Sequence, residues 1–174
     1  MTDEIADDSE FEIIEPIEKE RSRGSVMREL ESWERIIEGL KMASEGAREM
    51  ARWAFPDKWN QFAMYLDSVR KAVIRDGGFD RPADAKESEQ KFGGDRMPMV
   101  QACSRVFNGL KMAAAGADQI ANCQRLDIRW VTYALRFREL ADIQRKLSIE
   151  TTARITDQGW RNKVSGLIVP SRLH

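Results

Sequence analysis

The sequence predicts an all-α fold: a helical bundle made of two tandem helical-hairpin repeats related by a pseudo-twofold axis, with an extended arm at each end. Three observations lead to this prediction. One stretch of sequence recurs in the second half of the chain, and only five prolines interrupt 174 residues. Apolar or small residues also recur at alternating intervals of three and four, the spacing of one helix face. Hydrophobic residues make up 42% of the chain, which is enough for a core at this length.

The repeat can be seen directly in the sequence. Residues 35–51 are RIIEGLKMASEGAREMA and residues 105–121 are RVFNGLKMAAAGADQIA, so GLKMA and the following GA recur without a gap. Further along, a one-residue slip aligns Trp59 with Trp130. Such self-similarity indicates two copies of one supersecondary unit. The predicted parts are an acidic arm at 1–24, a bundle at 25–149 containing repeat one at about 34–75, a linker at 76–97 and repeat two at about 104–146, and a tail at 150–174.

Capping and breaking residues predict the helix ends in the first copy. Ser25 is a suitable N-cap for the first helix, and Pro56 stops that helix. Asp57 can cap the second helix, which ends at Gly77 and Gly78.

The second copy follows the same plan. Its first helix begins near Pro98, and Asp127 opens the last helix. No stop signal precedes Ser148, and this helix can continue toward Gly159. In the linker, residues 83–91 can form a short surface helix after a proline.

Small residues at intervals of four predict a close helix crossing. Glycine inside a helix costs about 1 kcal/mol relative to alanine, so the repeated glycines need a structural reason. We expect the small-residue stripe of one copy to pack against that of the other. The alternative is a ligand-lined or exposed alanine face. The predicted packing seam is Gly39, Ala43, Ala47, Ala51, Gly109, Ala113, Ala117 and Ala121.

Charge is distributed unevenly, although the net charge is only -1. Residues 1–20 hold nine acids and one base, whereas residues 124–174 hold ten bases and five acids. An acidic head and a basic tail can attract each other within a chain or between copies, or both can simply be solvated. Both ends also contain apolar residues, which predicts partner-binding arms. The candidate anchors are Phe11, Ile13, Ile14, Ile17, Trp160, Leu167 and Ile168.

The residues needed for common catalytic and metal sites are missing from the sequence. The only histidine is His174, the last residue, which excludes catalytic triads and histidine-based zinc or di-iron sites. Cys103 and Cys123 lie about 30 Å apart if they share one helix, too far for a disulfide. Glu45 and Glu49 belong to a set of helix-face carboxylates that alternates with bases, which is typical of a solvated face. We therefore predict no catalytic residues, no cofactor and no metal.

A basic stripe in the second copy is the best candidate for nucleic-acid contact. Arginines alternate there with aromatic residues, a combination that can bind phosphates and stack bases. The aromatic residues nevertheless fall on the predicted core face. The candidate residues are Arg129, Arg136, Arg138, Arg145 and Lys146.

These observations favour assembly over catalysis. We expect a non-enzymatic structural or adaptor protein that binds protein partners as a homo-oligomer or as a subunit of a larger complex. By analogy of architecture, such a chain could be a virion component. The alternative is a nucleic-acid-binding accessory factor of the packaging or partition type. The acidic N-terminus is unlike a secretion signal, and no run of about 18 apolar residues occurs. The expected location is therefore the cytoplasm, or the virion if the assembly is viral.

Overall fold

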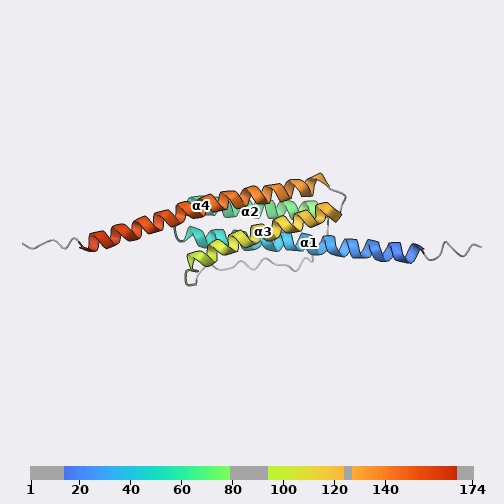
Figure 1. Ribbon diagram of the computed structural model, residues 1–174, viewed down its shortest axis with the longest axis horizontal. Helices are drawn as coiled ribbons and strands as arrows, with labels where there is room; N and C mark the ends of the chain where they lie inside the picture. The colour runs from blue at the N-terminus through green and yellow to red at the C-terminus, as the bar shows by residue number, and fades with distance from the viewer. Residues whose placement is uncertain (1–13, 79–93, 124–126, 168–174) are drawn as a thin grey trace, which may run out of the picture.

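The computed structural model describes residues 14–78, 94–123 and 127–167, and these ranges are helical apart from short connections. The helices are α1 (Ile14–Ala51), α2 (Pro56–Gly77), α3 (Met99–Cys123) and α4 (Ile128–Leu167). They lie along one common axis, with α1 projecting from one end of the bundle and α4 from the other (Figure 1). The predicted all-α bundle is thus confirmed for the described residues, none of which lies in a strand.

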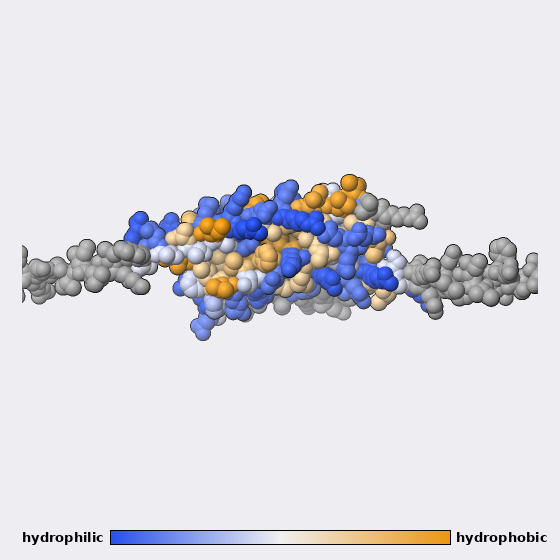
Figure 2. All heavy atoms as spheres, viewed as in Figure 1, coloured by the Kyte–Doolittle hydropathy of each residue, from blue (hydrophilic) through white to orange (hydrophobic). Residues whose placement is uncertain are grey.

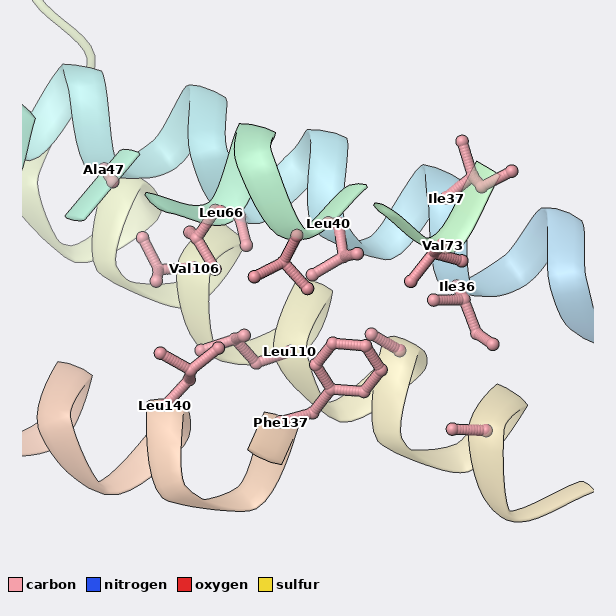
Figure 3. Close-up of a cluster of buried hydrophobic side chains, with 14 of the residues drawn as sticks. Ile36, Ile37, Leu40, Ala47, Leu66, Val73, Val106, Leu110, Phe137 and Leu140 are labelled. Atoms are coloured by element: carbon pink, nitrogen blue, oxygen red, sulfur yellow. The ribbon is translucent and has the colours of Figure 1, made fainter. Parts of the chain in front are cut away.

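The helices pack as two hairpins joined through their first members. α2 packs on α1, α4 packs on α3, and the most extensive contact is that between α1 and α3. Buried side chains from all four helices fill the space between them (Figure 3). The largest fully buried side chains are Trp59, Phe137, Ile36, Leu40, Met50, Leu66, Leu110, Ile120, Leu140, Val73, Val106 and Thr151.

The predicted start of the first helix at Ser25 is wrong, because α1 begins at Ile14. Pro16 does not prevent this, since the first backbone N–H groups of a helix have no intrahelical acceptor and proline is tolerated there. The Ser25 hydroxyl instead donates to Glu29 Oε1 at 3.4 Å, one turn later. Residues 14–24, predicted to belong to an extended arm, therefore continue the first bundle helix.

The predicted cap of α2 by Asp57 is also wrong. The N-cap is Phe55, with φ 49° and ψ 54°, and no side chain caps the helix. Pro56 takes the first helical position, where its missing N–H costs nothing. The left-handed backbone is unusual for a residue other than glycine. Lys58 Nζ lies 4.9 Å and the Arg154 guanidinium 5.1 Å from the centre of the Phe55 ring.

The start of α4 follows the prediction. Asp127 precedes the helix, and its Oδ1 accepts a hydrogen bond from the Arg129 backbone N–H at 2.9 Å. α4 continues past Gly159 to Leu167, so much of the predicted tail is helix as well. The short helix predicted at 83–91 lies outside the described residues.

Candidate functional site

The centre of the bundle is a close crossing of α1 and α3. A methyl group on Gly39 would lie 2.5 Å from the carbonyl oxygen of Gly109, and one on Gly109 would lie 2.3 Å from the carbonyl oxygen of Gly39. No side chain can occupy such a space without moving a helix. Glycine at both positions lets the two backbones touch.

A second pair of glycines flanks the crossing in matching fashion. A methyl group on Gly46 would lie 2.8 Å from the carbonyl oxygen of Ala102, and one on Gly116 would lie 2.6 Å from that of Ser32. Ala102 is the counterpart of Ser32 in the repeat, as Gly116 is the counterpart of Gly46. The two contacts therefore involve positions that align in the sequence.

The alanines of the predicted seam lie beside these glycines. Ala51, the last residue of α1, is partly buried against the core. The others are at most 3% exposed, namely Ala43, Ala47, Ala113, Ala117 and Ala121. In this chain the small-residue stripe faces inward, where it is closed to an outside ligand.

Polar side chains frame the crossing. Arg105 Nη2 binds Glu45 Oε2 at 2.6 Å, and Arg35 Nη1 donates to Gln119 Oε1 at 3.2 Å. Glu49 is only 9% exposed and accepts the backbone N–H of Met97. Two of the carboxylates expected on a solvated face thus have specific partners. Within the described residues no group of three histidine, cysteine, aspartate or glutamate residues could hold a metal ion.

The predicted basic stripe is divided among several contacts. Arg129 pairs with Asp127 at 2.9 Å, and Arg138 pairs with Asp118. Arg136 donates to the Tyr65 hydroxyl at 2.6 and 2.8 Å and pairs with Glu139 at 2.9 Å. The acids reduce the positive charge available to a phosphate, and the tyrosine occupies two hydrogen-bond donors of Arg136.

The last two members of the stripe are exposed neighbours that line different grooves. Lys146 lines a groove between α2 and α4, whereas Arg145 lines one between α3 and α4. Neither side chain forms an ion pair with any residue that the structure describes.

Four of the seven predicted partner-binding residues lie in the projecting ends of α1 and α4. Ile14 and Ile17 are in the first turn of α1, and Trp160 and Leu167 are in the last turns of α4. Phe11, Ile13 and Ile168 fall outside the described residues. The two groups are placed at opposite ends of the bundle (Figure 1).

The groove between α2 and α4 was not predicted from the sequence. It has a volume of about 490 Å³ and combines an apolar floor with charged rims. Tyr65 is 38% exposed and Ile143 is 48% exposed. α2 and α4 meet across it through long side chains, including a pair between Lys58 and Glu150 at 2.9 Å. The groove is lined by Lys58, Gln61, Phe62, Tyr65, Arg136, Leu140, Ile143, Lys146, Leu147 and Glu150.

At one end of this groove, buried polar groups join the same two helices. Trp59 Nε1 donates to Thr151 Oγ1 at 2.9 Å, and that hydroxyl donates to the Leu147 carbonyl at 2.8 Å. At the other end the Tyr133 hydroxyl donates to Asp76 Oδ2 at 2.6 Å. This bond lowers the pKa of Asp76, whereas burial and the same bond raise the pKa of Tyr133 to about 12.

A second hollow, of about 630 Å³, lies on the surface between α3 and α4. Trp33, which aligns with Cys103 in the sequence, packs between α1 and α2, where it is 2% exposed and donates to the Val73 carbonyl at 3.0 Å. A methyl group on Gly77 would lie 2.0 Å from the Trp33 indole nitrogen. Cys103, the counterpart of Trp33 in the repeat, is too small to fill the hollow, and its thiol donates to Ser148 Oγ at 3.4 Å.

The difference between the copies leaves apolar surface uncovered. Phe107 is 43% exposed, whereas Ile37, its counterpart in the repeat, is 3% exposed. Less hydrophilic residues run between rows of charged ones over α3 and α4 (Figure 2). The sequence held a usable signal for this hollow, because tryptophan in one copy aligns with cysteine in the other.

Comparison with protein-family models, with curated proteins and with solved structures finds no match to this chain. Among the described helices, none combines the length and the apolar character needed to cross a membrane.

Proposed function

We propose that this chain is a non-enzymatic assembly or adaptor subunit, acting through its helical bundle and its projecting terminal helices. The observation that supports this most is the length of α1 and α4 beyond the shared core. From residue 23, where the structure first describes the side chains of α1, the first buried residue is Ser32, although the helix begins at Ile14. Likewise α4 continues to Leu167, and Thr151 is the last buried residue among the α4 side chains that the structure describes, which leave out 160 and 163–167. Helical segments that extend past the core of their own bundle are suited to contacts with a partner.

We further propose that the body consists of two copies of one hairpin related by a pseudo-twofold axis through the α1–α3 crossing. The reciprocal contacts of Gly39 with Gly109 support this arrangement, as do those of Gly46 with Ala102 and of Gly116 with Ser32. A body built in this way is rigid at its centre and directs its two projecting helices apart.

Contact with nucleic acid has less support. Three of the five candidate bases are paired with acids, namely Arg129, Arg136 and Arg138. Catalysis also has little support, because the sequence has a single histidine at its last position.

The mass of the native protein tests the proposal. Native mass spectrometry of the protein as isolated from its source should give a mass well above the 20.0 kDa of one chain, as a homo-oligomer or with other polypeptides. Recovery of the single chain alone at all working concentrations would contradict it. Bound oligonucleotide would favour the nucleic-acid alternative.

A further inference from the structure

We infer that the groove between α2 and α4 binds the acidic N-terminal segment of a second copy of this chain, residues 10–18. This inference rests on the proposed assembly function and names the contact through which copies associate. The segment reads EFEIIEPIE, with four acids, no base, and apolar residues in between. Its chemistry is complementary to that of the groove.

The groove offers both kinds of contact that such a segment needs. Its floor is apolar, with Phe62 and Leu140 below the partly exposed Tyr65 and Ile143. Its rim carries three bases and one acid; Lys58 is paired with that acid, Glu150, and Arg136 is paired with Glu139. Lys146 is left without an ion-pair partner among the described residues. Opposite charge at a rim guides association, while apolar contacts on the floor provide affinity.

The segment cannot reach the groove of its own chain. Asp67 of α2 accepts a hydrogen bond from Ser44 of α1 at 2.7 Å, which places the two helices in register. The groove residues of α2 precede Asp67 and so lie level with still later residues of α1. Both Ile17 and Ser44 belong to α1.

The rise of a helix converts this register into a distance. Along a straight helix the stretch from Ile17 to Ser44 measures about 40 Å. The earlier residues of the segment, even fully extended, span at most about 25 Å. Only a second copy can therefore bring the segment to the groove.

The hollow between α3 and α4 is a weaker candidate for the same segment. Its lining contains a single charged residue, Arg145, and so offers little attraction for four acids. This difference provides matched controls, because Arg145 and Lys146 are consecutive and exposed and yet line different grooves.

Self-association of the full chain is the test, measured by sedimentation equilibrium across a range of concentrations. Lys146→Glu should weaken association about tenfold, because it places like charges together. Arg145→Glu, with an equal change of charge, should leave association unchanged. Ile143→Asn should also weaken association about tenfold, whereas Ile149→Asn in the other hollow should not. Circular dichroism of each variant confirms that the bundle is folded.

Charge exchange makes the test specific for the partners. A chain carrying Glu12→Lys and Glu15→Lys should associate poorly with itself, as should the Lys146→Glu chain. A mixture of the two should regain association, because the altered segment then meets an altered groove. No recovery in the mixture, or equal effects of Lys146→Glu and Arg145→Glu, would overturn the inference.

Two further outcomes separate this inference from the proposed function. If Arg161→Glu weakens association and Lys146→Glu does not, copies meet through the basic end of α4 and the groove assignment is wrong. If the purified chain stays monomeric, the groove assignment is also wrong. The proposed function then still depends on the mass of the protein isolated from its source.

Discussion

Gly39 and Gly109 face each other across the bundle, each lying where a methyl group on the other would meet its carbonyl oxygen at 2.5 Å or less. Two helices that approach this closely cannot accept a side chain at the crossing. The approach also places Ala113 beside Gly39 and Ala43 beside Gly109, so the burial of these alanines depends on the glycines.

Gly109→Ala should lower the free energy of unfolding by about 1–3 kcal/mol, because the added methyl group overpacks the crossing. Gly159→Ala is the control, since nothing lies within 4 Å of a methyl group there. Removing a helix-interior glycine at that open site should be neutral or stabilising by up to about 1 kcal/mol. Urea denaturation measures both variants, and equal effects would contradict the close crossing.

Leucine at Ala47 or Ala117 should be destabilising for the same reason, by about 1–3 kcal/mol or more. Both alanines are fully buried. Thermal melts report the change. A melting temperature unaltered by both substitutions would show that the seam accepts a leucine side chain, which contradicts close packing there.

Trp33 in the first repeat aligns with Cys103 in the second, and this difference allows a test of whether the two repeats are equivalent. The one-residue slip that aligns Trp59 with Trp130 also aligns Gly77 with Ser148. Trp33 leaves no space for a methyl group at Gly77. Cys103→Trp alone should therefore be accommodated poorly, because Ser148 carries a side chain at the aligned position. Adding Ser148→Gly should recover about 1–3 kcal/mol in the free energy of unfolding. The exposed fraction of Phe107 should fall at the same time.

A double-mutant cycle measures this coupling. Ser148→Gly in the otherwise unchanged chain should cost up to about 1 kcal/mol through helix propensity. If the effects of the two substitutions on the free energy of unfolding are additive, the hollow is not the counterpart of the Trp33 site. The pseudo-twofold arrangement then loses this support.

The hydrogen bond between Tyr133 and Asp76 predicts a dependence of stability on pH at both extremes. The pKa of Asp76 is lowered in the folded chain, so its stabilising effect is present above the pKa of an unfolded aspartate, about 3.9. This effect is lost as the pH falls through the folded value. The pKa of Tyr133 is raised from its ordinary value of 10.0 to about 12. The contribution of Tyr133 to stability is therefore fully present below the ordinary tyrosine pKa and is lost as the pH rises through the pKa of Tyr133 in the folded chain.

Tyr133→Phe removes the hydroxyl and tests both the acid and the alkaline dependence of stability on pH. Ultraviolet titration should show one tyrosine ionising near the raised pKa of about 12, and this step should be missing from the variant. The loss of stability in acid should also become smaller, since the Tyr133 hydroxyl is the main cause of the lowered pKa of Asp76. If the variant loses as much stability in acid as the unchanged chain does, the Tyr133 hydroxyl is not the cause of the lowered pKa of Asp76.

The four-helix architecture could be predicted from the repeated GLKMA and GA, but the start of α1, the cap of α2 and the grooves could not. Ser25 and Asp57 are good caps by residue type, yet α1 passes through Ser25 and Phe55 is the N-cap of α2. Periodicity shows which face of a helix is apolar but does not show how far away the facing helix lies. Tyr65 and Ile143 are partly exposed because α2 and α4 flank the tight α1–α3 pair and meet through long side chains.

The central claim is that copies associate through parts of the chain that the bundle itself does not need. Deletion of residues 1–24 tests it most directly, with assembled mass measured by light scattering during size-exclusion chromatography. Ser32 is the first buried residue among the α1 side chains that the structure describes, which start at residue 23. The shortened chain should therefore keep the helical content of residues 25–174 and its melting temperature, while its assembled mass falls toward that of one chain. An unfolded product, or an assembly with as many copies as before, would contradict the claim.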